Sequence, residues 1–486
     1  MSVFNNVLRP IIGPSSSHTY APLRVGYYAH RVYREKFGEP HGHVKVRVSF
    51  LGHSAGACRG HESYRAIVGG LLGICPYDKE ALKRIRDVRI DGEKVEVNGE
   101  RAENISFRYI EDPRRTYFSD VKGRRIRGLG IELTMEDERG KKLTVEAESI
   151  GGGNVDIIDV DPKPVLPNLE FVPVRGRVRK YGFKKLEELE ELARKEGSIH
   201  AVVIEREAEL LLEGEEEVMD LMRDNWGIMM ASIQMGLRGG FRGLLTGDEA
   251  IRLQRFIDEG RCLNKLLVNV AKYAMAVMAV NVSMGGLIVS APTAGSSGIL
   301  PAVLKAVYDE MIDHGEQISE DDVVRSLFTA GGIGLVFSNR GLTSASSHGC
   351  QAECGTSSAM AAAAITELRG GSPEQVMNAS ALALKNSLGL VCDPVCGLVE
   401  VPCVKRNAVY ATVALLAAEM SLAGIKSVIP ADEVIDAMDE VGRNMKRMYK
   451  ENSRGGLANT ETGERLMGKL RGRPRFRVPV EVVGHR

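Results

Sequence analysis

Two different patterns of hydrophobic and polar positions divide the chain. Three segments of the first third alternate between polar and apolar residues, as half-buried strands do: 43–50 (HVKVRVSF), 88–97 (VRIDGEKVEV) and 143–147. Helical patterns lie among them, at 21–37 and 62–72. Strands that alternate with helices in this way predict an α+β domain, which we place at residues 1–165.

The later part of the chain is dominated by long apolar runs. Residues 273–302 carry no charge and are numerous enough to span a bilayer. Asn, Ser, Gly and Pro interrupt this run, so two buried helical segments joined by a Gly/Ser turn are favoured over a membrane helix. The Ala-rich runs 359–368 and 408–422 have a similar character. We therefore predict a multi-domain protein in which a mostly α-helical domain occupies residues 183–466.

Two segments fit neither domain. Residues 161–178 hold four prolines and no apolar periodicity, which predicts a linker at 166–182. Residues 469–477 (KLRGRPRFR) place a basic residue at every second position, and we interpret 467–486 as a basic surface tail. One short basic stretch is weak support for a nucleic-acid-binding arm.

Composition and charge narrow the classes of function. Lys and Arg total 64 and Asp and Glu total 64, so the chain has no net charge with which to hold nucleic acid or an anionic membrane. We expect neither partner. The first ten residues, MSVFNNVLRP, lack the apolar segment of a signal peptide, so we expect a cytoplasmic protein.

Five of the eight cysteines are concentrated in one stretch: Cys350, Cys354, Cys392, Cys396 and Cys403. Eight are too few for a disulfide scaffold in a chain of this length, so the clustering points to metal or cofactor ligation. The two CxxxC pairs fit a closed four-thiolate site, which is usually structural zinc. An iron–sulfur cluster and inert buried thiols are the alternatives that spacing alone leaves open.

Seven further segments carry a family resemblance: 13–19 (GPSSSHT), 58–73 (CRGHESYRAIVGGLLG), 149–153 (SIGGG), 291–304 (APTAGSSGILPAVL), 348–364 (HGCQAECGTSSAMAAAA), 388–408 (LGLVCDPVCGLVEVPCVKRNA) and 453–463 (SRGGLANTETG). In this order they closely resemble the iron–sulfur-dependent L-serine dehydratases, or L-serine ammonia-lyases, in a single-chain form with fused beta and alpha parts. The resemblance covers both predicted domains and makes the helical one catalytic.

The resemblance implies a [4Fe–4S] cluster held by three thiolates, Cys350, Cys392 and Cys403. One iron then keeps an open position and can act as a Lewis acid on a substrate hydroxyl. Cys354 and Cys396 fall where non-ligand residues are expected. The implied reaction is deamination of L-serine to pyruvate and ammonia, a step of amino-acid degradation that feeds gluconeogenesis.

Two histidines lie inside the matched motifs. His61 is interpreted as the catalytic base that removes the α-proton. His18 follows Ser15, Ser16 and Ser17, a polar loop whose hydroxyl and N–H groups could hold the substrate carboxylate. The alternative for these serines is a helix cap.

The loop at 291–298 resembles an anion-binding turn before a helix. Its small residues let the backbone approach a ligand, and we assign Thr293, Gly295, Ser296 and Ser297 to substrate binding. Tight packing is the alternative. Without a Gly-Lys-Ser/Thr ending, it is not a phosphate-binding Walker loop.

The chain departs from its relatives in three places. Glu62, Ser63 and Tyr64 follow His61 where a small residue, Thr and Asp are common, and His348 lies near Cys350 as a third histidine. The final residues contain no cysteine, so we expect no cysteine tail to close the site. These departures leave L-threonine or another β-substituted amino acid as alternative substrates.

An alternative from another class is a non-catalytic four-thiolate metal-binding protein that uses Cys354 or Cys396. For the enzyme we expect a small amino-acid substrate and a homodimer.

Overall fold

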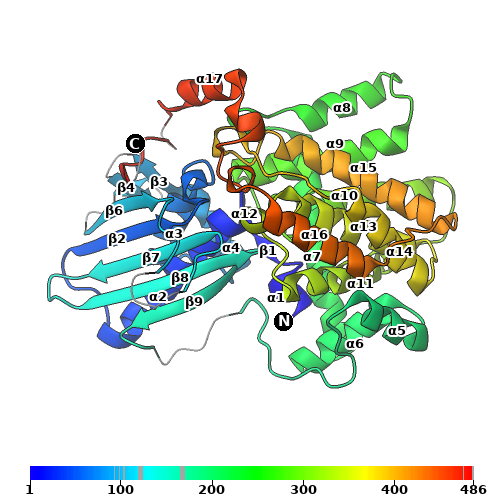
Figure 1. Cartoon of the computed structure of the whole chain (residues 1–486), viewed down its shortest axis with the longest axis horizontal. Helices are drawn as coiled ribbons and strands as arrows, with labels where there is room; N and C mark the ends of the chain where they lie inside the picture. The colour runs from blue at the N-terminus through cyan, green and yellow to red at the C-terminus, as the bar shows by residue number, and fades with distance from the viewer. Residues whose placement is uncertain are drawn as a thin grey trace.

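The computed structural model describes residues 1–91, 94–97, 99–101, 104–118, 124–164, 170–473 and 476–483. A sheet domain and a helical domain lie next to each other (Figure 1). The prediction of an α+β domain followed by a mostly helical domain is confirmed.

A mixed six-stranded sheet forms the framework of the first domain, in the order β11-β6-β2-β7-β8-β9. Its strands are β2 (Val44–Leu51), β6 (Ile105–Asp112), β7 (Leu129–Glu136), β8 (Lys142–Gly151), β9 (Asn154–Asp161) and β11 (Val480–Val482). β2 pairs with β6 in parallel and with β7 antiparallel. A separate small sheet holds β3 (Val88–Asp91), β4 (Lys94–Val97) and β5 (Glu100–Arg101). The segment 88–97 thus contributes two paired strands, and residues 92–93 lie outside the described residues.

The helices α2 (Ala21–Phe37) and α3 (Ser63–Leu71) confirm the two helical patterns of the first third. Their backbones approach closely, because a Cβ atom on Gly70 would lie 2.2 Å from the Leu23 carbonyl oxygen. On β2, Val46 and Val48 are buried whereas Lys45 and Arg47 are exposed. The alternation read in the sequence therefore reflects a sheet with one covered face.

The second domain consists of helices packed around α13. Its principal helices are α5 (Leu186–Glu196), α6 (Ile199–Leu211), α7 (Glu215–Arg238), α8 (Glu249–Asp258), α9 (Lys265–Ser283), α10 (Ile299–Asp313), α11 (Glu320–Asn339), α13 (Cys354–Leu368), α14 (Pro373–Lys385), α15 (Cys403–Leu422), α16 (Ala431–Asn444) and α17 (Glu461–Leu470). Residues 354–366 of α13 are all buried. Small Ala and Ser side chains let α10, α11, α14 and α15 surround it.

Helix α9 is long and apolar enough to cross a membrane by length and composition alone. It packs instead against α7, α8, α10 and α15, and 61% of its most apolar window is buried. The uncharged run at 273–302 contains the end of α9, the short strand β10 (Ile288–Val289) and the start of α10. The prediction of two buried helical segments joined by a turn is therefore confirmed for residues 273–302.

Both end segments of the described chain cross between the domains. The helix α1 (Val3–Asn6) packs on α11, and β1 (Pro10–Ile11) pairs with β10, so this segment joins the helical domain. Its apolar residues are too few to show a periodicity, which is why the boundary at 1–165 placed them with the sheet.

The predicted basic surface tail at 467–486 also differs from the structure. Residues 467–470 complete α17, Phe476 and Val478 are buried, and β11 pairs in parallel with β6. Residues 474–475 and 484–486 lie outside the described residues. Leu470 and Phe476 of this segment pack with Val395, Cys396 and Leu398 of the helical domain. The end of the segment contributes an edge strand.

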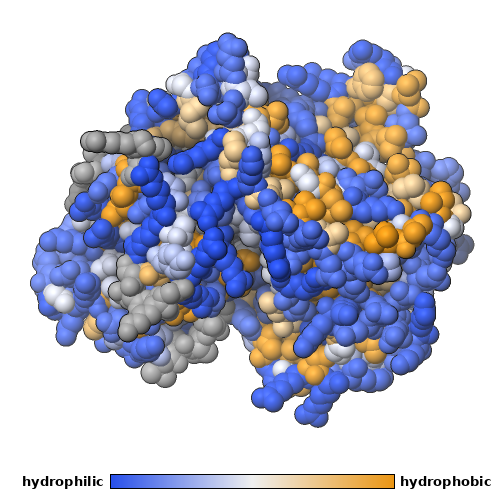
Figure 2. Space-filling model, in the orientation of Figure 1, coloured by the Kyte–Doolittle hydropathy of each residue, from blue (hydrophilic) through white to orange (hydrophobic). Residues whose placement is uncertain are grey.

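The two domains present different surfaces in the view of Figure 2. The sheet domain is mostly polar there, whereas apolar side chains gather over the helical domain. On α15, Val409 and Leu416 are 56% and 60% exposed. The outward side of α15 is therefore apolar.

Candidate active site

Two buried histidines from the first domain lie next to each other. His18 belongs to the turn Ser16–Tyr20 that leads into α2, and His61 precedes α3. Their ring centroids are 4.9 Å apart. The Thr19 hydroxyl donates to the His61 carbonyl oxygen at 2.6 Å, and the Ser63 hydroxyl donates to that of His18. Reciprocal bonds between the two turns thus fix both rings.

The hydrogen bonds of each ring define which nitrogen is free to accept a proton. His61 Nδ1 lies 2.8 Å from the Ala57 carbonyl oxygen, which can only accept, so this nitrogen carries a hydrogen, and in the neutral ring Nε2 is the one left without. His18 Nε2 lies 3.2 Å from the Ser54 carbonyl oxygen, so its Nδ1 accepts from the Ser17 hydroxyl at 3.0 Å. Neutral His61 therefore presents an unprotonated Nε2 atom.

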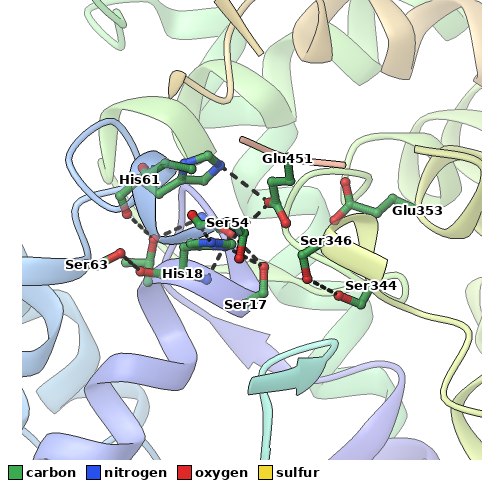
Figure 3. A network of polar contacts seen from close by, with 12 residues as sticks. Ser17, His18, Ser54, His61, Ser63, Ser344, Ser346, Glu353 and Glu451 are labelled. Atoms are coloured by element: carbon green, nitrogen blue, oxygen red, sulfur yellow. Dashed lines mark hydrogen bonds and ion pairs between the residues drawn. The ribbon is translucent and has the colours of Figure 1, made fainter. Parts of the chain in front are cut away.

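Glu451, from the second domain, faces both histidines. Its Oε1 atom lies 3.5 Å from His61 Nε2 and 3.6 Å from His18 Nδ1 (Figure 3). Its Oε2 atom is buried and has no hydrogen-bond partner among the described residues. Burial raises the pKa of this carboxyl, but the two histidines hold it below its ordinary value. The site thus contains a buried carboxylate between two imidazoles.

Burial has the opposite effect on His18. Desolvation lowers its pKa to about 4, although the negative charge of Glu451 opposes this shift. His18 is therefore neutral near pH 7.

Cys350, Glu353 and Cys392 form a buried group of potential metal ligands, whose ligand atoms all lie within 4.8 Å of one another. Hydrogen bonding with Cys354 and Cys392, together with the positive charge of Arg406, holds the pKa of Cys350 well below its ordinary value. The same contacts and burial raise the pKa of Cys354 and Cys392. Cys350 is thus the thiol that ionises first.

Backbone contacts bring Cys392 next to Glu451. The Cys392 N–H donates to the Tyr449 carbonyl oxygen at 2.8 Å, and the Glu451 N–H donates to the Cys392 carbonyl oxygen at 3.0 Å. Arg406 fixes the same loop from the other side by donating to the Val391 carbonyl oxygen at 2.8 Å and to Asp393 at 2.9 Å. The thiol group and the histidine pair therefore share one wall of the site.

The remaining cysteines of the cluster occupy different environments. Cys354 begins α13 beside Cys350. Cys403 begins α15; its pKa is raised by burial and by the charge of Cys350, which places it near the group. Cys396 packs among Leu398, Leu470 and Phe476 in a separate apolar cluster. The structure thus gathers Cys350, Cys354 and Cys392, keeps Cys403 near them, and directs Cys396 elsewhere.

The loop at 291–298 borders this group through two of its four predicted residues. A Cβ atom on Gly295 would lie 3.1 Å from Glu353 Oε2, and Thr293 hydrogen-bonds to Glu353. Burial and the charge of Cys350 raise the pKa of Glu353 well above its ordinary value. The hydroxyls of Ser296 and Ser297 instead donate to loop carbonyl oxygens of Ala291 and Ala294. These two serines shape the loop, whereas Thr293 and Gly295 face the site.

The three serines before His18 have different contacts. Ser15 accepts the His18 N–H at 3.1 Å as a cap, and Ser17 holds the His18 ring. The Ser16 hydroxyl is buried and has no hydrogen-bond partner among the described residues. Ser16 therefore remains available to a ligand.

His348, the third histidine near the cysteine motifs, forms hydrogen bonds with neighbouring side chains. Its Nε2 atom lies 3.0 Å from Asp439 and its Nδ1 atom 2.7 Å from the Ser347 hydroxyl. Burial lowers its pKa, which Asp439 partly offsets. Both ring nitrogens are thus used in structural contacts.

The glycine-rich turn at 149–153 joins the two domains beside this site. Gly151 has a φ of 98°, and a Cβ atom there would lie 2.8 Å from the Thr343 carbonyl oxygen. Ser344 and Ser346, whose hydroxyls are 2.7 Å apart, follow Thr343 and lie on the Glu353 side of Glu451 (Figure 3). The turn lets the sheet domain approach the site closely.

Sequence reasoning missed three residues of this site: Glu353, Arg406 and Glu451. Glu353 and Arg406 lie inside matched motifs, at positions to which no role was given. Glu451 lies just before the matched segment 453–463, and only the fold brings it to the histidines. A buried carboxylate far along the chain leaves no signal in local spacing.

Comparison with known proteins places both halves of this site in one family. Residues 2–158 match the serine dehydratase beta chain family and residues 194–458 match the serine dehydratase alpha chain family. The chain belongs to the serine dehydratase family. In this serine dehydratase family member the histidines lie in the beta-chain part, whereas the cysteines and Glu451 lie in the alpha-chain part.

Individual relatives support the same assignment along the whole chain. The L-serine dehydratase of Streptomyces coelicolor is 35% identical over 92% of this chain and 96% of its own length. L-serine dehydratase 1 of Escherichia coli is 34% identical over 92% of this chain and 96% of its own length. A probable L-serine dehydratase alpha chain of Bacillus subtilis is 46% identical over 60% of this chain and 96% of its own length. The one-chain relatives thus align with nearly all of this protein, and the alpha-chain relative aligns with 60% of it.

Proposed function

We propose that this protein converts L-serine to pyruvate and ammonia with a [4Fe–4S] cluster held by Cys350, Cys392 and Cys403. One observation supports this proposal most directly. Glu451 contacts the Nε2 atom of His61 through its side chain and the loop of Cys392 through its backbone. The proposed base, His61, and the cysteine group therefore both lie next to Glu451.

The residues present fit such a cofactor. Thiolates are the ligands of iron–sulfur clusters, and the contacts that lower the pKa of Cys350 favour its thiolate form. Arg406 lies beside the thiols; burial lowers its pKa, but the charges of Cys350 and Asp393 raise it above its ordinary value. A guanidinium in this position balances the negative charge of ionised thiolates. A cluster with three thiolate ligands would supply a Lewis-acidic iron for the substrate hydroxyl.

The side chains of the site can then perform the elimination. Nε2 of His61 takes the proton from Cα of serine, and Glu451 stabilises the imidazolium that forms. Thr293 and Gly295 beside Glu353, and the Ser16 hydroxyl that has no partner among the described residues, are the groups that would bind the substrate carboxylate. The β-hydroxyl leaves and takes up the equivalent of the proton that His61 removed, so that one water is lost in total and aminoacrylate is formed. Its imine tautomer adds water and releases ammonia and pyruvate.

The position of Cys396 argues against the form of the non-catalytic alternative that uses this thiol. Cys396 packs among Leu398, Leu470 and Phe476, and the charge of Cys350 affects the pKa of Cys403 but is not among the causes that raise the pKa of Cys396. Burial and the charge of Glu400 raise the pKa of its thiol, which favours the uncharged form. A Cys350, Cys354, Cys392 and Cys396 site does not agree with this arrangement.

The test is anaerobic purification followed by an assay with L-serine and, in parallel, L-threonine. We expect a brown protein that deaminates L-serine, loses activity and colour in air, and regains part of both with ferrous iron and thiol. Iron-free or zinc-loaded protein with full activity would overturn the cofactor assignment. A higher kcat/KM for L-threonine would reassign the substrate.

The cytoplasmic location and the homodimer stay predictions. Light scattering of the purified holoenzyme at several concentrations measures its mass. We expect twice the mass of one chain.

A further inference from the structure

A cavity of about 580 Å³ lies between the domains, next to the active site. We call it the interdomain pocket. The side chains that decide its chemistry are Arg59, Arg454, Arg471, Met467, Phe476 and Val482. They come from the sheet domain, from the segment after Glu451 and from the closing segment of the chain. The pocket is therefore built by three separate parts of the sequence.

The charge of the interdomain pocket is positive. Three arginines line it against one carboxylate, Glu111. Glu111 already accepts the Tyr64 hydroxyl and lies 3.5 Å from Arg59 Nε. Arg454 and Arg471 form no ion pair with any residue that the structure describes. Two guanidinium groups thus remain for an anion.

Two further donors in the pocket form no hydrogen bond among the described residues, although Arg59 Nε keeps its ion-pair contact with Glu111. Arg59 Nε and the Ser453 hydroxyl are buried and have no hydrogen-bond partner among the described residues. Buried donors of this kind are usually satisfied by a ligand or by water. Both residues line the pocket together with Arg454.

The opposite wall is apolar. Met467, Phe476 and Val482 line it, and Phe476 is buried among Cys396, Leu398 and Leu470. An anion with a short carbon body satisfies both walls, since its oxygens meet the arginines and its carbon atoms meet the apolar surface. Guanidinium groups bind carboxylates with two parallel hydrogen bonds.

Two residues that line the pocket adjoin active-site residues in the chain. Gly60 and Asn452 line it, and their neighbours in the chain are His61 and Glu451. Gly397 lines it too, and a Cβ atom on Gly60 would lie 2.1 Å from the Gly397 carbonyl oxygen. A ligand in the pocket thus touches the neighbours of both the base and its carboxylate.

We propose that the interdomain pocket binds a short-chain carboxylate at a site separate from the substrate site. Arg454 and Arg471 take the carboxylate, Arg59 and Ser453 supply the additional donors, and Phe476 with Met467 covers the carbon body. The proposal rests on the pocket's own side chains, not on the proposed reaction.

Calorimetric titration of the anaerobic holoenzyme with pyruvate tests this site without turnover. We expect Arg454→Gln combined with Arg471→Gln to weaken pyruvate binding at least about tenfold, since each removes a charged hydrogen-bond donor. Arg477→Gln, an exposed arginine of the same closing segment outside the pocket, is the matched control and should bind as the wild type does. The single variant Arg454→Gln, at an exposed position, should weaken binding in the same direction.

Two comparisons make the assignment falsifiable. His61→Ala should keep pyruvate binding, and its loss there would place the anion in the active site and overturn the proposal. Inorganic phosphate has no carbon body, so tight binding of phosphate without binding of pyruvate would overturn the carboxylate assignment. Equal pyruvate binding in the double variant and the wild type would overturn the site itself. None of these results depends on whether the protein deaminates L-serine.

Discussion

The Oε1 atom of Glu451 lies 3.5 Å from the Nε2 atom of His61, and the two residues come from different domains. The Ala57 carbonyl oxygen fixes the hydrogen of His61 on Nδ1, so the nitrogen that faces Glu451 is the one that can accept a proton. The proposed base and the carboxylate that faces it therefore meet only at the domain interface.

His61→Ala should lower kcat by about 10² to 10⁴, the usual contribution of a general base. The absorbance of the cluster and the iron content should stay at the wild-type level, because His61 is not a predicted ligand. His314→Ala, at an exposed histidine on the surface of the helical domain, is the control. Turnover near normal in His61→Ala would assign the base to another group.

Glu451→Gln should lower kcat by about 10² with little change in KM, because the amide cannot stabilise the imidazolium as a carboxylate does. Glu451→Asp keeps the charge and should recover part of the loss. Steady-state kinetics with iron determination on each variant separates a positioning role from loss of the cluster. Glu433→Gln, at an exposed position of α16, should behave as the wild type. A Gln variant with unchanged kcat would remove Glu451 from the mechanism.

Cysteine-to-serine variants distinguish the ligands from their neighbours. We expect Cys350→Ser, Cys392→Ser and Cys403→Ser each to lose most of the iron, since serine is a poorer ligand for iron than thiolate. Cys354→Ser and Cys396→Ser should keep it, with Cys262→Ser as a control outside the cluster. Iron per chain is the measurement. If Cys403→Ser retains its iron and Cys354→Ser loses it, then Cys354 is the third ligand in place of Cys403.

Acid should destabilise the protein in part through His18. Its folded-state pKa of about 4 lies below the ordinary value of 6.5, so between these values the unfolded state binds more protons. Stability attributable to His18 is complete above about pH 6.5 and falls as the pH drops towards about 4, by up to about 1.4 kcal/mol per pH unit. His18→Asn should therefore lose less stability than the wild type between about pH 7.5 and about pH 5. Urea unfolding at both values checks this; equal losses would contradict it.

Local patterns predicted the elements of the fold well where one face of a segment is buried. The alternation of Val46 and Val48 with Lys45 and Arg47 identified β2 because the sheet has one covered face. The segments that cross between domains escaped prediction. The strands β1 and β11 are two and three residues long, and their partners lie far away in the sequence. No period can be read from so few positions.

The candidate site divides in a similar way. Motifs indicated His18, His61, Cys350 and Cys392, because each lies in a distinctive local sequence. The same motifs did not reveal that the Ser296 and Ser297 hydroxyls are used within their own loop. Glu451 could not be predicted, since its function as a partner of His61 exists only after the two domains meet.

The placement of Glu451 also governs when the protein can become active during its synthesis. The ribosome makes His18 and His61 early, but it reaches Glu451 and the strand β11 only after hundreds of further residues. At about 5–20 residues per second, that interval lasts roughly tens of seconds. Throughout it, the nascent chain carries the two histidines without the carboxylate that faces them. The centre therefore matures only once synthesis has passed Glu451, and a chain that stalls earlier cannot contain it.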